Sequence, residues 1–141
     1  MQEGDVGRIV VCRIFEDEDL MAAIKKRAEE SGVKTGAFIV IGSLKNAVLG
    51  YYRNGKYEYV QLDGPLEIAS GTENIAVGEN GEVMIHVHVV VSDEKCRAFG
   101  GHLVKDSLVG ATAELVIVEG LGLNVQRGFD EKTKLNLLKL G

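Results

Sequence analysis

Two Asn-Gly dipeptides, each placed between apolar segments, constrain the fold of this chain most strongly. One lies in Arg53-Asn-Gly-Lys56 and the other in Gly78-Glu-Asn-Gly81. Asn-Gly favours the tight turn that joins two antiparallel strands, because both residues reach positive φ angles at low cost. The sequence therefore predicts β-hairpins, and with them a sheet that is mainly antiparallel.

Segments rich in β-branched and aromatic residues surround these turns and indicate strands. Gly42 or Gly50, inside the long second segment, is expected to mark a bulge or bend. Asp63-Gly-Pro65 is expected to turn the chain, and residues 92–105 are expected to form a loop. The tail, residues 119–141, has a mixed pattern. The predicted strands are Val6–Phe15, Thr35–Tyr52, Tyr57–Leu62, Leu66–Val77 with an interruption near Ser70-Gly71, Glu82–Val91 and Val109–Val118.

One amphipathic helix is predicted within Glu16–Gly32. Leu20, Ile24 and Ala28 repeat every four residues and form one apolar stripe. Asp17 is a suitable N-cap, and the glycine that closes the range suits the position just after a helix. One helix with about six or more strands, mostly joined by hairpins, predicts an α+β fold, with residues 1–141 as a single domain.

Composition narrows the class of protein. A chain of 141 residues with a net charge of -5 and a pI of about 5.2 does not suit a general nucleic-acid binder. The N-terminus MQEGDVGR predicts no secretory signal peptide, and no apolar run reaches the ~18 residues that span a bilayer. Cys12 and Cys96 are too few for a disulfide framework. We therefore expect a cytoplasmic protein without a membrane partner.

The chain has three histidines, and they lie close together in the sequence. His86 and His88 stand in MIHVHVVVSD, and His102 follows Gly100-Gly101. Side chains alternate between the faces of a strand, so His86 and His88 point the same way. Paired glycines allow a close backbone approach, which would aim His102 at that strand.

Three imidazoles predict a transition-metal site, with zinc as the first candidate and nickel, iron or copper as alternatives. Three ligands leave a coordination position open, which is typical of catalytic or ligand-binding sites. A histidine on a strand is also often a half-buried residue that holds a hydrogen bond. A packing role for His86, His88 and His102 therefore remains an alternative.

Further polar residues lie near the histidines in the sequence. Cys96 is interpreted as a fourth ligand, a nucleophile or neither, and Cys12 as a core residue. Asp106 and Ser107 are expected either to support the histidines or to form a solvated turn.

Carboxylates are the candidates for a general base. Glu114 interrupts an apolar strand, where it needs either a partner such as Arg13 or Arg127 or an exposed edge position. Glu67, Glu73 and Glu114 are the carboxylates to test, and the catalytic residues remain unknown.

The chain resembles the PPC domain, the plant and prokaryote conserved domain. MIHVHVVVSD followed by Gly-Gly-His-Leu and by a strand with Thr-Ala-Glu matches the characteristic pattern of that family. The resemblance extends over nearly the whole chain. Its other segments are Arg13-Ile-Phe with Glu18-Asp-Leu20, Gly36–Tyr52, Leu66–Ile75 and Arg127–Leu135.

The resemblance implies a curved, mainly antiparallel sheet with one principal helix, a homotrimer, and a metal held by His86, His88 and His102. In plant members the domain follows an AT-hook that enters the minor groove of DNA. These 141 residues contain no such segment, and Gly64-Pro-Leu-Glu-Ile68 replaces the plant Gly-Arg-Phe-Glu-Ile motif for partner contacts. DNA binding and that partner activity are therefore doubtful, and the chain resembles stand-alone archaeal or bacterial members.

Two functions are consistent with the sequence. The first is a trimeric metal-binding protein whose open site binds or transforms a small molecule or an anion. The second is a non-enzymatic interaction module, DNA-associated or protein-binding, in which the histidines are structural. The sequence does not decide whether the chain is an enzyme.

Overall fold

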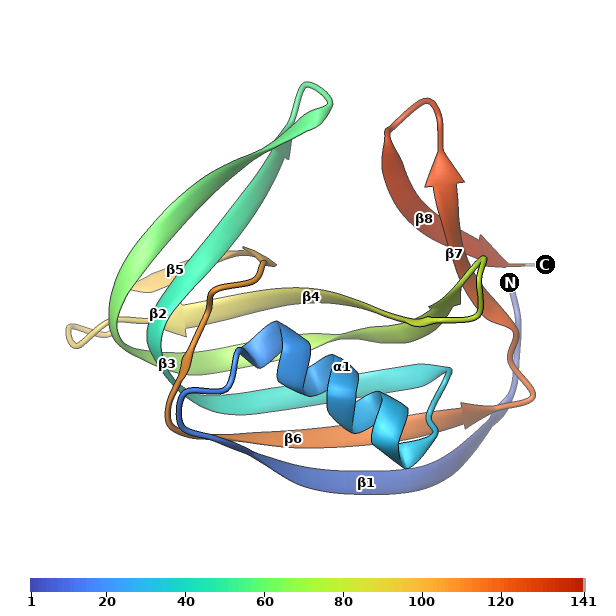
Figure 1. Cartoon of the computed structure of the whole chain (residues 1–141), viewed down its shortest axis with the longest axis horizontal. Coiled ribbons are helices and arrows are strands. Elements are labelled where there is room, and N and C mark those ends of the chain that lie inside the picture. The colour runs from blue at the N-terminus through green and yellow to red at the C-terminus, as the bar shows by residue number, and fades with distance from the viewer. Residues whose placement is uncertain (141) are drawn as a thin grey trace.

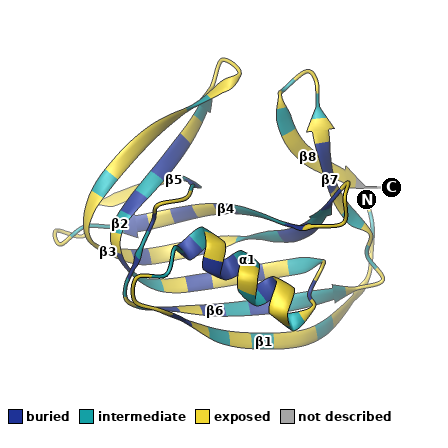
Figure 2. Cartoon of the chain, in the orientation of Figure 1, coloured by how far each residue is buried: buried dark blue, intermediate teal, exposed yellow. Residues whose placement is uncertain are grey.

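The computed structural model describes residues 1–140, and within them the chain forms one helix and eight strands (Figure 1). Buried and exposed residues alternate along much of the strands, as expected for a sheet with one face on a core (Figure 2). The elements are β1 (Asp5–Phe15), α1 (Leu20–Ser31), β2 (Gly36–Arg53), β3 (Lys56–Gly78), β4 (Val83–Ser92), β5 (Ala98–Leu103), β6 (Val109–Leu121), β7 (Val125–Asp130) and β8 (Leu135–Leu140).

The helix α1 packs against one face of the sheet and closes the core (Figure 1). Leu20, Ile24 and Ala28 are fully buried, which confirms the predicted apolar stripe. They pack with the inward side chains of the strands, including Ile14 and Phe38. Within residues 1–140 no helix is long and apolar enough to cross a membrane.

The N-cap of the helix lies two residues later than predicted. Asp19, and not Asp17, is the N-cap, and its Oδ1 accepts a hydrogen bond from the Ala22 backbone N–H at 2.9 Å. Asp17 lies in the preceding turn with a φ of 67°. The end of the helix confirms the prediction, since Gly32 adopts the left-handed conformation with a φ of 72°.

The sheet has the strand order β1-β6-β2-β5-β4-β3-β7-β8, and β2 also pairs with β3. The pairings are antiparallel except for the short parallel contact between β3 and β7. The long strand β2 pairs with β6 and β3 along its first part and with β3 and β5 along its last part. Because β5 also pairs with β4, and β4 with β3, these four strands close into a ring of pairings.

Both predicted Asn-Gly turns are confirmed. Asn54 and Gly55 have φ angles of 52° and 81°, and Gly81 has a φ of 80°. The predicted bulge is also present, because the β2–β3 register shifts between Val40 and Gly42.

Two predictions about chain breaks are wrong. Asp63-Gly-Pro65 is not a turn, because β3 runs through it as one strand while the register against β2 shifts nearby. The expected loop at residues 92–105 contains β5. Its sequence, Ala-Phe-Gly-Gly-His-Leu, has little strand propensity of its own, and pairing with β4 and β2 holds it extended.

A single cross-strand row links the first strand to two of the histidines. Each member lies directly opposite the next in the registers of the sheet, so the row places them in one line across six strands. The row runs through Val11 of β1, Val116 of β6, Ile39 of β2, Thr72 of β3, His88 of β4 and His102 of β5.

Candidate metal centre

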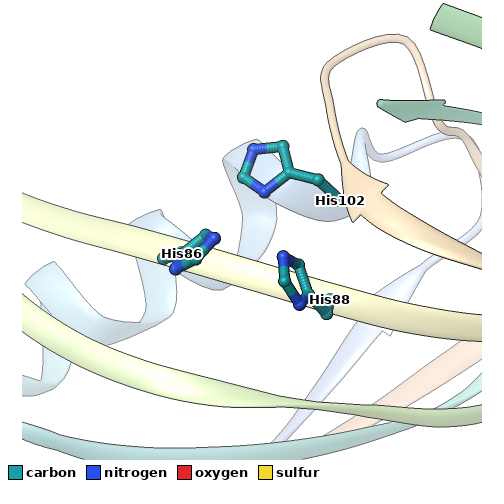
Figure 3. A group of neighbouring side chains, drawn as sticks. All are labelled: His86, His88 and His102. Carbon is teal, nitrogen blue, oxygen red and sulfur yellow. The ribbon is translucent and has the colours of Figure 1, made fainter. Parts of the chain in front are cut away.

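The three histidines meet at one point, as the sequence predicts (Figure 3). Each offers one ring nitrogen, and these nitrogens all lie within 4.8 Å of one another. The ring centroids of His86 and His88 are 4.8 Å apart, those of His86 and His102 4.9 Å, and those of His88 and His102 5.6 Å. Among residues 1–140, these three histidines form the group of histidine, cysteine or acidic side chains whose ligand atoms lie close enough together to hold one metal ion.

Backbone pairing explains why His102 arrives there. His102 lies opposite His88 on one side of β5 and opposite Gly50 of β2 on the other. The neighbouring Gly101 lies so close to β2 that an added Cβ would be 3.2 Å from the Gly50 carbonyl oxygen, tighter than ordinary van der Waals contact. The glycine pair thus allows β5 to fit between β4 and β2, which confirms its predicted role.

The donor set fits a metal ion. His102 Nδ1 is buried and has no hydrogen-bond partner in the described part of the chain. A buried polar nitrogen without a partner is costly, and coordination of a metal would satisfy it. The imidazoles of His86 and His88 supply the remaining nitrogen ligands that zinc and its neighbours prefer.

His86 is held by a network of polar groups that comes from two other strands, β3 and β7. Its Nδ1 lies 3.4 Å from Glu73 Oε2 and 3.3 Å from Arg127 Nη2. Asn74 joins these two groups: its side-chain N–H donates to Glu73 Oε2 at 3.3 Å, and its Oδ1 accepts from Arg127 Nη2 at 2.9 Å. With Nδ1 occupied, Nε2 is the nitrogen of His86 left for coordination.

The two contacts at His86 Nδ1 require opposite tautomers. The Arg127 guanidinium donates, so that contact needs Nδ1 without a proton and places the proton on Nε2. The Glu73 carboxylate accepts, so its contact needs the proton on Nδ1 and leaves the Nε2 lone pair free. Glu73 therefore favours the tautomer that can bind a metal through Nε2, whereas Arg127 favours the other one.

Burial keeps two of the three histidines, His86 and His102, neutral. It lowers the pKa of His86 to about 4, and the nearby Arg127 and His88 contribute. Burial likewise lowers the pKa of His102 to about 4; His86, His88 and Arg127 lower it further, and Glu73 opposes them. Both imidazoles are therefore unprotonated at neutral pH, as metal ligation requires.

Apart from Glu73 and Arg127, the other residues singled out in the sequence lie away from this centre. Of the carboxylates, Glu73 contacts His86, whereas Glu67 and Glu114 are exposed and have no ion pair in residues 1–140. Glu114 is exposed, as one of the two alternatives expected, but it lies opposite Arg13 on β6, which is inside the sheet between β1 and β2 and not at an edge. Cys96 is exposed and outside the cluster.

Asp106 and Ser107 anchor the segment after β5, and they do not support the histidines. Their backbone N–H groups both donate to Asp19 Oδ2, at 2.7 and 3.2 Å. Ser107 is fully buried, and its hydroxyl accepts from the Val48 N–H and donates to the Val104 carbonyl. The expected solvated turn is therefore wrong for Ser107.

Two pockets open beside the cluster. One, of about 540 Å³, is lined by His88, His102, Ser70, Thr72 and Tyr57, among others. The other, of about 340 Å³, contains His86, His102, Arg127 and Tyr57. The histidines therefore lie at the boundary between two hollows that a small molecule could enter. Sequence reasoning considered Arg127 only as a partner for Glu114 and missed its place beside His86.

The lowered pKa values predict how the stability of the metal-free protein depends on pH. In the unfolded chain His86 and His102 titrate near 6.5, and in the folded protein near 4. Between these values the unfolded chain binds more protons, so the free energy of unfolding decreases as the pH falls from 6.5 to 4. Above this window the two histidines add no pH dependence. Urea denaturation at several pH values measures the effect.

The control for this experiment is the variant His86→Gln with His102→Gln, which keeps every carboxylate. It should lose less stability between neutral and acid pH than the wild type. Equal losses in the two proteins would contradict the lowered pKa values, as would imidazole signals that titrate near 6.5 by NMR.

Known proteins share this fold over its full length. The metal-containing protein from Archaeoglobus fulgidus is 30% identical, with a TM-score of 0.87 over 97% of this chain and 96% of that one. The plant- and prokaryote-conserved (PPC) protein of Pyrococcus horikoshii is 29% identical, with a TM-score of 0.89 over 100% of this chain and 98% of that one.

A curated relative contains a similar segment within a longer protein. The chain is 25% identical over 137 residues to the bifunctional protein GlmU of Synechococcus sp. (strain JA-3-3Ab). The match covers 89% of this chain and 19% of that protein, so the chain spans about a fifth of the length of this relative.

The sequence profile of the Plants and Prokaryotes Conserved (PCC) domain matches residues 1–120. The chain therefore belongs to the Plants and Prokaryotes Conserved domain family.

Proposed function

We propose that this chain is a metal-binding member of its family, in which His86, His88 and His102 hold a divalent transition metal and present it to a small ligand. The observation that carries the proposal is the convergence of three ring nitrogens within 4.8 Å. The buried His102 Nδ1 without a partner supports it, as does the similarity to the metal-containing protein of Archaeoglobus fulgidus.

Zinc is the first candidate for the metal, because three neutral imidazoles form the nitrogen-only set of many catalytic zinc sites. Bound there, the metal would supply a Lewis acid with a coordination position open to a small molecule or an anion. The chain itself supplies the ligands, the Glu73 contact that orients His86, and the pockets on both sides. The proposal assigns binding to this site and no reaction.

Metal content is the direct test. Protein purified without a histidine tag should contain about one zinc ion per chain by mass spectrometry, since three histidines form one site. The variant His86→Ala with His88→Ala should contain none. Cys96→Ser is the matched control, because it removes a potential metal ligand that lies outside the cluster and should leave the metal content unchanged.

The other outcomes are equally informative. Metal in neither protein, with the assembly intact, would return the histidines to a packing role and make the interaction module the leading function. Equal metal in wild type and the double variant would place the ion elsewhere. Nickel, iron or copper in place of zinc would correct the identity of the metal and keep the site.

Glu73 should strengthen metal binding through its contact with His86. Carboxylates that accept from a metal-bound histidine typically contribute about 10–100-fold to metal affinity. Glu73→Gln, which removes the charge, should weaken binding by about this factor in competition with a chelating dye. Glu67→Gln changes an exposed carboxylate on the same strand and is the control. Equal affinities in the two variants would refute the orienting role of Glu73.

Assembly into a homotrimer is the second part of the proposal. The face of the sheet opposite α1, here called the open face, carries exposed apolar side chains from neighbouring strands. Val11 is 73% and Ile39 54% exposed, and Ile9, Ile41 and Val90 add to the same face. A contiguous apolar surface of this kind is typical of a protein–protein contact, and the family resemblance suggests the trimer.

A cytoplasmic location completes the proposal and is consistent with the free thiols of Cys12 and Cys96.

A charge on the open face should disrupt this assembly. We expect sedimentation analysis to give the mass of three chains for the wild type and of one chain for Ile39→Glu, because the buried carboxylate would have no partner. Leu138→Glu, a comparable change at an exposed leucine of β8, should remain trimeric. A monomeric wild type would contradict the trimer, and a trimeric Ile39→Glu would place the contact on another surface.

A further inference from the structure

The smaller pocket beside the histidines, here called the Arg127 pocket, has the lining of an anion site. It has a volume of about 340 Å³ and lies between the β4–β5 region and the β7–β8 hairpin. The lining has a polar part and an apolar part. The polar part consists of Tyr57, His86, His102, Arg127, Lys134 and Asn136. The apolar part consists of Met84, Ile85, Leu135 and Leu137.

Arg127 is unusual among the residues that line this pocket, because a buried arginine normally has a paired partner. It is only 8% exposed, and in the part of the chain that the structure describes it forms no ion pair with a carboxylate. Glu73 attracts it electrostatically but lies beyond ion-pair distance. A buried charge without an ion-pair partner is costly, so its retention points to an anion that is present when the protein functions.

The guanidinium is already held in place. Its Nη1 donates to the Asn136 carbonyl at 3.0 Å and its Nη2 to Asn74 Oδ1 at 2.9 Å, while Nε has no partner. A fixed guanidinium loses little further freedom when a ligand binds, which favours affinity. The network that positions Arg127 is the same one that contacts His86.

The charge of the pocket is positive although the chain carries a net charge of -5. Its lining contains Arg127 and Lys134 and, among the described residues, no aspartate or glutamate. Lys134 pairs with the exposed Glu131, so Arg127 remains as the cation of this lining without an ion-pair partner in residues 1–140. One guanidinium matches one carboxylate in shape and charge, whereas a phosphate dianion commonly receives several donors.

The remaining lining selects for an organic ligand. Met84, Ile85, Leu135 and Leu137 offer aliphatic surface beside the guanidinium. A short hydrocarbon chain would remove this surface from water, which inorganic anions cannot do. The pocket volume limits the ligand to a small molecule.

We propose that the Arg127 pocket binds a small aliphatic carboxylate, with its carboxylate on the Arg127 guanidinium and its hydrocarbon part against the apolar wall. This inference rests on the proposed metal-binding function in one respect: it names the class of small ligand that the site beside the histidines receives. Arg127 and the apolar lining residues, and not the metal, recognise the carboxylate ligand.

Calorimetric titration with matched probes tests the proposal. Pentanoate is the carboxylate probe, and pentanamide has the same length without the charge. Wild-type protein with measured metal content should bind pentanoate at least about tenfold more tightly than pentanamide, because a hydrogen bond to a charged group contributes more than one between neutral groups. Inorganic phosphate should bind more weakly than pentanoate. This comparison needs no variant and does not depend on how substitutions affect folding.

Variants locate the site. Arg127→Gln should lower pentanoate affinity at least about tenfold, because it removes the charge, and should reduce the preference over pentanamide. Lys132→Gln, an exposed lysine outside the pocket, is the matched control and should bind as the wild type does. Equal binding of pentanoate and pentanamide, or unchanged binding by a folded Arg127→Gln, would overturn the proposal. Tighter binding of phosphate would also overturn it.

The same samples separate this inference from the proposed function. A wild type that contains no transition metal but binds pentanoate would refute the metal site and support the carboxylate site. Full metal content without pentanoate binding at millimolar concentrations would support the metal site and refute the carboxylate site.

Discussion

The register of the sheet is the constraint on which the rest of this structure depends. One cross-strand row runs from Val11 through Ile39 and Thr72 to His88 and His102. Side chains alternate along each strand, so a slip of one residue in β4 would turn its histidines into the apolar core. The same register directs the buried valines of β4 toward α1, so the core and the histidine cluster form together.

The polar network at His86 shows how the fold prepares this cluster. Burial keeps His86 and His102 neutral, and Glu73 and Arg127 compete for the proton arrangement of a single ring nitrogen. The carboxylate favours metal ligation, and the guanidinium opposes it while it keeps its own charge buried. The two proposed sites therefore meet at one imidazole, since His86 belongs to the metal cluster and also lines the Arg127 pocket.

Local chemistry made much of this fold predictable. The Asn-Gly turns, the apolar stripe of α1 and the β-branched strands follow from the preferences of short segments, and the structure confirms them. Predictions at Asp63-Gly-Pro65 and at β5 are wrong because neighbouring strands override local preference there. The N-cap is displaced to Asp19, whose second carboxylate oxygen also receives the N–H groups of Asp106 and Ser107 from a distant segment.

The sequence by itself determined that His86 and His88 share a face, because strand periodicity is a local property. It also indicated that Gly100-Gly101 bring His102 close, although the pairing of β5 with β4 and β2 was not predictable. Only the tertiary structure decided that Glu73, and not Glu67 or Glu114, contacts the cluster, and that Arg127 lies beside it without an ion pair in residues 1–140. Arg127 is 41 residues away from His86 in the sequence, and no local pattern encodes a contact that only the packing of β7 against β3 creates.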